Sequence, residues 1–397
     1  MDFIDLYLYH VGRSEVPKQF HLFCALSLLS ASLGDRCWFD RDTSGRRIYP
    51  NLYVFLVGPS GSGKEIAVST AMRLVEGLDI LGIFPVTGIT KQSLIDRVSC
   101  LPTPDQPCPP HIIYLITEEL GMAVPSKELG RDLIKFMTGH YIPTGLPSFE
   151  GTRMHGIKRL PSPLFNWLCG TNEEWLRSAI EKDAIEGGFF ARVLAVRGQR
   201  DGTIRHAEMC YPDDFQDCRR RLRAWLEMLT TLRMRFVKTI EATLFYRNWY
   251  ESETLRPSPT EKILEPAFNR SDEMVHRLSM LLRVAKLEGV PLGVTDLEVG
   301  VSHIQEAIAI WEALMRDVPE IVKIAAATKE SGEVEIVREV VRRLKVVDHS
   351  SLLRRVGNRG LNAERLRPAL SHLIEAGEVK QVIEGEGRTR RAYQWVG

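Results

Sequence analysis

Between residues 49 and 200, short apolar runs alternate with longer stretches in which apolar residues recur at helical spacing. Each short run is continuous, rich in β-branched or aromatic residues, and close to the usual length of a buried strand. The four clearest are Leu52–Val57, Ile112–Ile116, Leu164–Cys169 and Val193–Val196. Strands that alternate with helices are typical of a parallel sheet with crossover connections, so the pattern predicts an α/β core.

The segments on both sides of this core have mostly helical patterns. In residues 1–48, apolar residues recur at near-helical spacing from Ser14 to Gly34, and a short strand is predicted at Arg36–Phe39. Residues 213–325 read as almost entirely helical, as in Phe215–Leu229, and belong to a predicted domain at residues 201–325. We therefore predict an N-terminal helical segment, the α/β core and a separate helical lid domain.

The last part of the chain, residues 333–397, has the pattern of a small separate domain. A polar stretch, Ala326–Gly332, precedes it like a linker. An amphipathic helix is predicted at Val334–Lys345, a second short helix is capped by Ser350, and a third opens at Asn362. Two strand-like runs follow, and this order of three helices and a β-hairpin resembles a winged helix.

The length and composition of the chain indicate a globular protein with more than one domain. A chain of 397 residues with 44% apolar and 26% charged residues is expected to form two or three globular domains. No apolar run is long enough to span a membrane, and Asp2 and Asp5 stand where a signal peptide would be basic, so we predict a cytoplasmic protein without a membrane partner. The seven cysteines form no CxxC pair, which argues against a zinc site and a disulfide framework.

A glycine-rich loop directly follows the strand at Leu52–Val57, and a helical stretch, Ile66–Val75, follows the loop. This is the GxxxxGK spacing of a phosphate-binding loop in its strand–loop–helix context. Glycines let backbone N–H groups turn toward phosphates, and the helix N-terminus adds its dipole. The predicted ATP-binding residues are Gly58, Pro59, Ser60, Gly61, Ser62, Gly63 and Lys64, with Lys64 reaching the β- and γ-phosphates.

The residue after Lys64 departs from the usual pattern. Ser or Thr normally stands there and binds Mg²⁺ through its hydroxyl, whereas this chain has Glu65. A carboxylate is a hard oxygen ligand that can hold Mg²⁺, but it also adds negative charge beside the triphosphate. We predict that Glu65 contacts the nucleotide and the metal. The sequence supports ATP binding more strongly than it supports efficient hydrolysis.

Two carboxylates end the strand at Ile112–Ile116, where the chain continues as Thr117, Glu118 and Glu119. An apolar strand that ends in acids after a phosphate loop is the Walker B arrangement, with Glu118 where Asp is usual. Glu118 is predicted to hold Mg²⁺ through water, and Glu119 to orient and deprotonate the attacking water. The alternative is a strand that runs into the acidic start of a helix.

Two further polar positions are candidates for catalysis. Thr171 and Asn172 follow the strand at Leu164–Cys169, and the carboxyl ends of parallel strands face the ligand crevice. Asn172 is our choice for contact with the γ-phosphate or the lytic water, although it is equally suited to cap the next helix. Arg192 precedes the last strand and is predicted to be an arginine finger that serves a neighbouring subunit, with a surface charge as the alternative.

Together these segments resemble the helicase-like ATPases of phages, plasmids and genomic islands, which are similar to the MCM-type branch of AAA+ proteins. The resemblance rests on Phe20, on the runs Tyr49–Lys64, Thr117–Leu120 and Cys169–Asn172, and covers about residues 15–325. It implies a homo-oligomeric ring, expected to be a hexamer, that uses ATP and Mg²⁺ to move along DNA during replication of a mobile genetic element. The two glutamates at the metal positions depart from the family pattern.

The resemblance also implies a DNA-contacting hairpin. In the related rings, a hairpin ahead of the strand that ends at Asn172 projects into the pore and touches DNA phosphates. The segment Leu146–Pro163 can form one, because Gly151 and Gly156 bracket a turn. An ordinary basic surface loop is the alternative. The implied DNA contacts are Arg153, Lys158 and Arg159.

An arginine of the helical lid is the last nucleotide contact that the resemblance implies. Arg277 is assigned this role, as a sensor of the γ-phosphate, and Arg270 is the second candidate. Arg277 lies on a helical face, and exposure to solvent is the default expectation for either side chain.

The C-terminal tail is more basic than the chain as a whole. From Val334 to Gly397 it has 13 Lys and Arg residues against 8 Asp and Glu residues, a net charge of +5, whereas the whole chain carries only +1. In a winged helix the third helix lies in the major groove and the wing on phosphates. The predicted DNA contacts are Arg365, Arg367, Arg388, Arg390 and Arg391. A winged helix that binds protein is the alternative.

Taken together, the sequence favours an ATP-dependent, ring-forming DNA helicase or translocase of a mobile genetic element. The chief alternative is a nucleotide-binding DNA initiator or helicase loader with slow or no hydrolysis, which Glu65 favours. A motor that acts on protein is a third possibility with little support from the basic tail. Since no primase-like domain precedes the core, a primase or initiator is expected to be a separate protein.

Overall fold

A five-stranded parallel sheet forms the centre of the larger part of the molecule. Its strand order is β4 (Gly82–Pro85), β5 (Ile112–Thr117), β8 (Leu164–Thr171), β3 (Tyr53–Val57) and β9 (Val193–Arg197). Every residue of β3, β5 and β8 is buried. Parallel sheets are covered on both faces, which explains why these strands read as continuous apolar runs. The predicted α/β core is confirmed.

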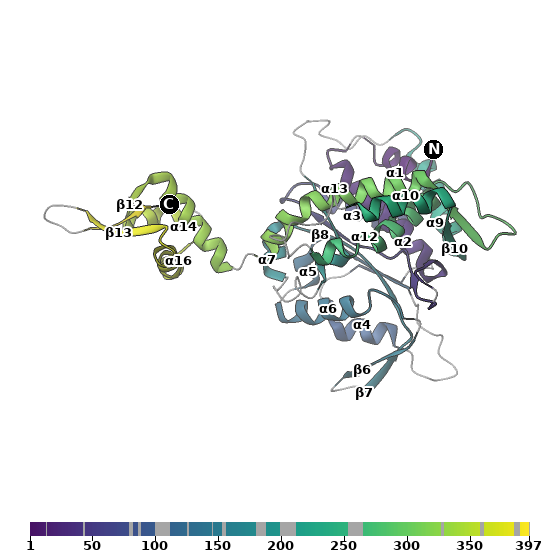
Figure 1. The fold of residues 1–397 in the computed structure, drawn as a ribbon, viewed down its shortest axis with the longest axis horizontal. Helices are drawn as coiled ribbons and strands as arrows, with labels where there is room; N and C mark the ends of the chain where they lie inside the picture. The colour runs from purple at the N-terminus through teal and green to yellow at the C-terminus, as the bar shows by residue number, and fades with distance from the viewer. Residues whose placement is uncertain are drawn as a thin grey trace. The chain divides into compact units, whose positions relative to one another are not determined.

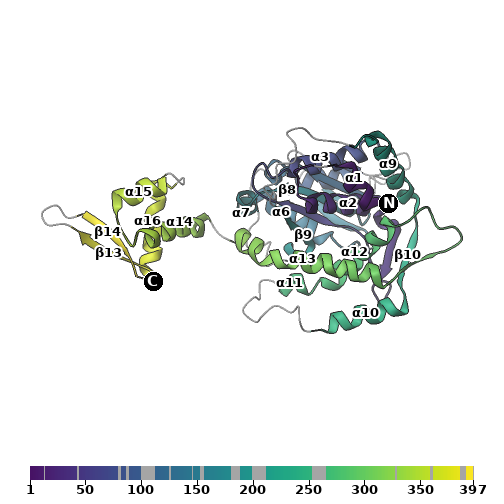
Figure 2. The same ribbon diagram turned by 90° about the horizontal axis from the view of Figure 1, so that it is seen from above.

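The computed structural model divides the chain into two compact units, Met1–Ile324 and Ala325–Gly397, which are described separately (Figures 1 and 2). All structural statements concern the residues that the structure describes. These are residues 1–12, 14–42, 44–78, 82–85, 89–99, 112–124, 127–144, 146–152, 156–179, 188–198, 212–252, 265–326, 329–357, 361–384 and 390–396.

Helix α2 (Lys18–Leu33) is almost entirely buried and packs against β3, β8 and helix α3 (Lys64–Val75). From Phe20 onward only Leu22 is less than fully buried. A helix that is apolar on every side belongs in a core, and this one is therefore surrounded. The carboxyl end of α3 is held by Arg223 of helix α9 (Phe215–Thr231), whose Nη1 donates to the carbonyl oxygens of Leu74 and Glu76 at 2.9 and 2.8 Å.

A second sheet joins the beginning of the chain to its helical region. Its order is β11 (Asp296–Val299), β10 (Met234–Lys238), β1 (Cys37–Asp40) and β2 (Arg47–Ile48), and β1 pairs in parallel with β10. The expectation that residues 213–325 are almost entirely helical is thus corrected, because β10 and β11 lie there. Both strands are short and only half buried, and such strands leave a weak apolar signal.

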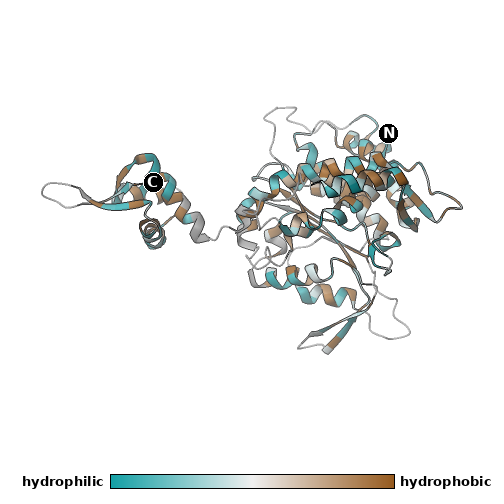
Figure 3. Ribbon diagram, in the orientation of Figure 1, coloured by the Kyte–Doolittle hydropathy of each residue, from teal (hydrophilic) through white to brown (hydrophobic). Residues whose placement is uncertain are grey.

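The remaining elements of the first unit surround these sheets, and the hairpin of β6 and β7 projects from its lower side in Figure 1. In Figure 3 the long helix α13 changes between teal and brown along its length, as expected of an amphipathic helix. No helix among the described residues is long and apolar enough to cross a membrane. The other elements are α1 (Phe3–His10), η1 (Gly34–Arg36), α4 (Lys91–Val98), α5 (Leu120–Ala123), α6 (Lys127–Gly139), β6 (Ser148–Thr152), β7 (Gly156–Leu160), α7 (Glu173–Ala179), η2 (Phe190–Arg192), α10 (Ile240–Glu251), α11 (Glu265–Phe268), α12 (Ser271–Ala285) and α13 (Val301–Ala326).

The second unit has its own apolar core, formed by residues such as Val337, Leu352, Leu366 and Leu373. The three predicted helices and the predicted hairpin are confirmed, and a short third strand that pairs with β14 was missed. The first helix also begins before the predicted Val334. Its elements are α14 (Lys329–Leu344), β12 (Val346–Asp348), α15 (His349–Gly357), α16 (Ala363–Glu375), β13 (Val379–Glu384) and β14 (Arg390–Trp395).

Side-chain caps set the starts of two helices in this unit. Asn362 caps α16, as predicted, because its Oδ1 accepts a hydrogen bond from the backbone N of Arg365 at 3.0 Å. Helix α15 is capped by Asp348 and not by the predicted Ser350. The Asp348 carboxylate accepts from the backbone N of Ser350 and Ser351 at 3.1 and 3.0 Å, so the helix starts earlier.

Candidate functional site

The segments after β3, β5 and β8 meet at the carboxyl edge of the five-stranded sheet. Because β8 lies between β3 and β5, its end is next to both the glycine-rich loop and the acidic pair. The backbone N of Gly58 donates to Thr171 O at 3.2 Å, which ties the start of the loop to the end of β8. The sheet order therefore gathers three sequence-distant candidates at one edge.

The glycine-rich loop folds back on its own lysine. Lys64 is only 4% exposed, and its Nζ donates to the carbonyl oxygens of Gly58 and Pro59, both at 2.8 Å. Gly61 and Gly63 have φ values of +77° and +88°, which side chains with a Cβ rarely adopt. The loop thus needs glycine where the GxxxxGK pattern has it.

The charge of Lys64 has no counter-ion within the described part of the chain. Burial lowers the pKa of its ammonium group, whereas the nearby carboxylates of Glu119 and Glu65 act in the opposite direction. A buried cation that is held only by neutral carbonyl groups has retained its capacity to pair with an anion. The arrangement suits a phosphate.

Glu119 and Asn172 contact each other across the gap between β5 and β8. Asn172 Nδ2 donates to Glu119 Oε1 at 3.2 Å. Burial raises the pKa of the Glu119 carboxyl, Lys64 opposes that shift, and the like charge of Glu65 adds to it. A carboxylate with a raised pKa beside an amide donor has the properties of a general base that is held in position.

Asn172 caps the next helix, which was the alternative role that the sequence offered, and it also contacts the acid. Its Oδ1 accepts from the backbone N of Trp175 at 2.9 Å, which caps α7, while its Nδ2 remains directed at Glu119. The cap and the contact with the acid do not compete because they use different atoms of the amide. The orientation of Asn172 is thus locked by the helix that follows it.

Two glycines that sequence reasoning missed bring the acidic pair close to β8 and α7. A Cβ on Gly170 would lie 2.2 Å from Glu118 O, and a Cβ on Gly121 would lie 2.3 Å from the ring of Trp175. Only glycine permits these approaches. A glycine inside a buried strand is the signal that could have identified the first of them, since such glycines often mark a close backbone contact.

The carboxylates near the loop provide hard oxygen atoms for a metal ion. Glu65 lies in the first turn of α3 and is exposed, and it is near enough to affect the pKa values of Lys64 and Glu119. Glu118 is exposed at the end of β5. Within the described residues, no group of three acidic, histidine or cysteine side chains is arranged as a preformed metal site. These ligands fit Mg²⁺, which keeps several waters and needs few carboxylates when phosphates also bind it.

Arg192 lies at the opposite, amino edge of the sheet. It ends η2, just before β9, and β9 runs parallel to β3, whose carboxyl end leads to the glycine-rich loop. Its Nη1 donates to Gly188 O at 2.6 Å, and its guanidinium is 5.9 Å from the centre of the Tyr141 ring. The length of a strand therefore separates Arg192 from the glycine-rich loop of its own chain.

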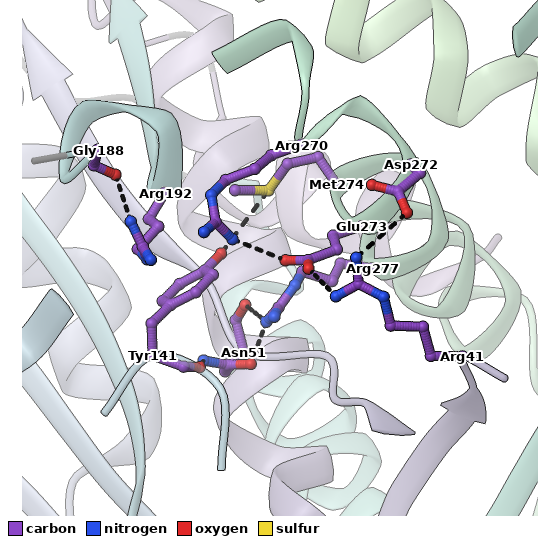
Figure 4. Close-up of polar contacts among 10 residues, drawn as sticks. All are labelled: Arg41, Asn51, Tyr141, Gly188, Arg192, Arg270, Asp272, Glu273, Met274 and Arg277. Carbon is purple, nitrogen blue, oxygen red and sulfur yellow. Dashed lines mark hydrogen bonds and ion pairs between the residues drawn. The ribbon is translucent and has the colours of Figure 1, made fainter. Parts of the chain in front are cut away.

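Arg277 also lies at the amino edge, which does not match its assignment to the nucleotide of its own subunit. It is 1% exposed, its Nη1 donates to Asn51 O at 2.6 Å and to Asn51 Oδ1, and it stacks 4.4 Å from the Tyr141 ring centre (Figure 4). Asn51 precedes β3, whereas Lys64 follows it. Helical spacing put Arg277 on a helix face, but only the fold shows that this face is buried.

Arg270 and Arg41 meet at the carboxylate of Glu273 in the same region (Figure 4). Arg270 Nη1 lies 3.1 Å from Glu273 Oε2, and Arg41 also pairs with Asp272 at 3.8 Å. Glu273 is 3% exposed, so its charge is balanced by two arginines. We refer to Arg41, Arg192, Arg270, Glu273 and Arg277 as the arginine cluster.

The predicted hairpin forms, but two of its predicted DNA contacts, Lys158 and Arg159, lie on opposite faces. On one face Lys158 bonds to Asp96 of α4, and Glu150 pairs with Lys91 of α4 at 2.9 Å. Lys158 is therefore engaged within the fold. Arg153 lies outside the described residues. The other face carries Arg159 with two exposed apolar side chains, Phe149 and Ile157.

In the second unit, the predicted DNA contacts also differ in their surroundings. Arg365 pairs with Glu333 of α14, whereas Arg367 is exposed on α16. Arg390 and Arg391 lie in β14, and Arg388 lies outside the described residues.

No protein-family model matches this chain, and no curated protein matches it. The chemistry of the site is therefore interpreted from its own residues.

Proposed function

We propose that this chain is a P-loop ATPase that binds ATP and Mg²⁺ at the carboxyl edge of the five-stranded sheet. One observation carries the proposal: Lys64, Glu119 and Asn172, which are far apart in sequence, converge there. Lys64 exchanges its bonds to Gly58 O and Pro59 O for bonds to the β- and γ-phosphates. The loop N–H groups and the start of α3 bind the remaining phosphate oxygens.

Hydrolysis uses the pair of Glu119 and Asn172. Glu119 takes a proton from the attacking water, and its raised pKa brings its basicity closer to that of an effective base near neutral pH. Asn172 holds Glu119 and is placed to contact the same water or the γ-phosphate. Mg²⁺, bound by Glu65 and Glu118 together with the phosphates, would neutralise charge on the triphosphate.

We further propose that the chain works as a ring-forming DNA helicase or translocase of a mobile genetic element. The amino-edge position of Arg192 supports assembly, because this arginine can act only on a partner's nucleotide. The projecting β6–β7 hairpin with exposed Arg159 and the basic C-terminal unit, proposed to be a winged helix, support a DNA partner.

A DNA-stimulated ATPase assay on the purified chain tests this proposal. We expect ATP turnover that needs Mg²⁺ and rises when DNA is added. Mixing inactive Arg192→Ala subunits with inactive Glu119→Gln subunits should restore part of the activity, because one type of interface then has both intact groups. A monomer with full ATPase activity would contradict the ring, and turnover that ignores DNA would contradict the motor.

The position of Glu65 favours a second function, that of a DNA initiator or helicase loader with slow hydrolysis. Two like charges about 4 Å apart repel by on the order of 4 kcal/mol at an effective dielectric constant of about 20, and exposure of Glu65 reduces this value. Glu65→Thr should then raise ATP affinity and turnover about tenfold. Lower turnover in the variant with Mg²⁺ present would instead identify Glu65 as a required metal ligand.

A further inference from the structure

Both ends of the phosphate loop pack against one short segment near the start of the chain. We call residues 14–20 the support segment. At the end of the loop, a Cβ on Gly63 would lie 2.7 Å from Val16 Cγ2. At its start, a Cβ on Gly58 would lie 3.3 Å from Phe20 Cζ. The backbone of the loop is thus in direct contact with two side chains of this segment.

Phe20 also supports the neighbouring strand. A Cβ on Gly198, which follows β9, would lie 2.5 Å from Phe20 Cζ, and Gly198 N donates to Val57 O at 3.0 Å. Both Val16 and Phe20 are buried, at 4% and 0% exposure. Close-packed side chains without free volume resist displacement, so the loop cannot move backward without moving the segment.

A short chain of hydrogen bonds fixes the shape of the support segment. The backbone N of Val16 donates to Ser14 Oγ at 3.3 Å, and Ser14 Oγ lies 3.1 Å from His21 Nε2. Burial lowers the pKa of His21 to about 4, so its ring is neutral near pH 7 and Nε2 can accept the Ser14 hydroxyl hydrogen. His21 lies in α2, a helix that is almost entirely buried.

We propose that His21 and Ser14 are positioning residues for the phosphate loop. Through Ser14, His21 holds Val16 against Gly63, and the loop keeps the conformation that receives the triphosphate. The inference rests on the proposed function, since it concerns the same nucleotide site. It adds residues that neither touch the nucleotide nor belong to the GxxxxGK pattern.

The positioning role predicts a specific loss of phosphate binding. Ser14→Ala deletes both hydrogen bonds by removing a single oxygen atom. We expect its Kd for Mg²⁺-ATP, measured by calorimetry on the full chain, to rise about three- to tenfold, the value of one or two hydrogen bonds. Turnover at saturating ATP should change by less than about twofold, because the Glu119–Asn172 pair is untouched. Ser14→Thr keeps the hydroxyl and should restore the affinity.

His10→Leu is the matched control. His10 is equally buried in the neighbouring helix α1, where its ring stacks on Phe215 at 4.3 Å. It should lower the melting temperature and leave the Kd unchanged. A loss of affinity in His10→Leu that matches the loss in Ser14→Ala would show a general structural effect and overturn the positioning role.

Val16→Ala provides a second test that leaves the hydrogen bonds intact. It removes the Cγ atoms that contact Gly63, and the Kd should rise in the same way as for Ser14→Ala. If the wild-type chain binds ATP and both Ser14→Ala and Val16→Ala bind it as tightly as the wild type, the positioning role is wrong but the proposed function is not affected. If the wild-type chain does not bind ATP, or if Lys64→Ala binds it as tightly, the proposed function fails and the inference fails with it.

Discussion

The two edges of the five-stranded sheet differ in whether their buried charged side chains form ion pairs. At the carboxyl edge, Lys64 bonds to backbone carbonyls and Glu119 to an amide, and among the described residues neither forms an ion pair. At the amino edge, Arg41 and Arg270 share the buried carboxylate of Glu273. Charges without a counter-ion cost solvation energy and are expected where a ligand supplies the counter-charge, whereas balanced charges stabilise the fold.

This difference shows how buried arginines and lysines of the same fold can be distinguished. Arg277 is buried as deeply as Lys64, and its Nη1 likewise bonds to neutral oxygens, those of Asn51, while its guanidinium lies 4.4 Å from the Tyr141 ring centre. Burial alone therefore does not indicate function. The clearer contrast is between Lys64, which forms no ion pair among the described residues, and Arg41 and Arg270, which share the Glu273 carboxylate. Substitutions at the carboxyl edge should affect ligands, and those at the amino edge should affect stability.

The largest effect is expected at the carboxyl edge, for Lys64→Ala. The triphosphate loses its loop cation, and charge-assisted hydrogen bonds contribute about 1.5–3 kcal/mol each, so the Kd for ATP should rise by at least about 10²-fold. Calorimetry would measure the Kd and thermal unfolding the stability, which should hardly change. ATP binding as tight as in the wild type would remove the contrast between the two edges.

Glu119→Gln should separate binding from chemistry at the same edge. The amide keeps the shape and the contact with Asn172 but cannot accept the proton, so ATP should still bind while turnover falls by a factor of about 10²–10⁴. A phosphate-release assay measures turnover. Glu118→Gln is the control, since Glu118 is exposed and is assigned to the metal. A larger loss in the control would transfer the role of base to Glu118.

At acid pH the free energy of unfolding should fall, because buried histidines are neutral in the folded chain. Burial lowers the pKa of His10 and His21 to about 4, and that of His276, near the arginine cluster, to about 3. Because their pKa is about 6.5 in the unfolded chain, the stability from these neutral rings is complete above pH 6.5 and is lost as the pH falls toward 4. The limit is about 3 kcal/mol each for His10 and His21.

Urea unfolding at pH 7 and at pH 5 measures this loss. His10→Phe keeps a ring that can stack on Phe215 but cannot take up a proton. Its free energy of unfolding should therefore depend less on pH than that of the wild type. The same pH dependence in both proteins would show that His10 does not contribute to acid sensitivity.

The smallest effect is expected from Glu273→Gln at the amino edge. The substitution leaves Arg41 and Arg270 without their shared counter-charge, and breaking a buried pair costs about 3–5 kcal/mol. Both arginines are partly exposed, so we expect about 1–2 kcal/mol of lost stability, measured by urea unfolding. The Kd for ATP should stay the same. A change in Kd without a change in stability would assign the cluster to ligand binding.

The sequence by itself determined four of the five strands of the central sheet and the glycine-rich loop, whereas the short edge strand β4 was missed. β3, β5 and β8 are buried on both faces, and such strands leave continuous apolar runs that need no knowledge of their neighbours. The loop could be predicted because Gly61 and Gly63 require backbone angles that only glycine adopts easily. Asn362 was likewise predictable, since a helix cap depends on residues next to it in sequence.

Only the tertiary structure decided which of these elements meet. That β8 lies between β3 and β5, and thus brings Asn172 to Glu119, depends on pairing between distant segments. The same holds for the burial of Arg277 and for the contact of Val16 with Gly63. Local sequence patterns predict the conformation and the burial of a residue, but they do not predict which distant residue it contacts. Contacts between distant residues form only when the whole chain packs, and that packing places Lys64 and the arginine cluster at opposite edges of the sheet.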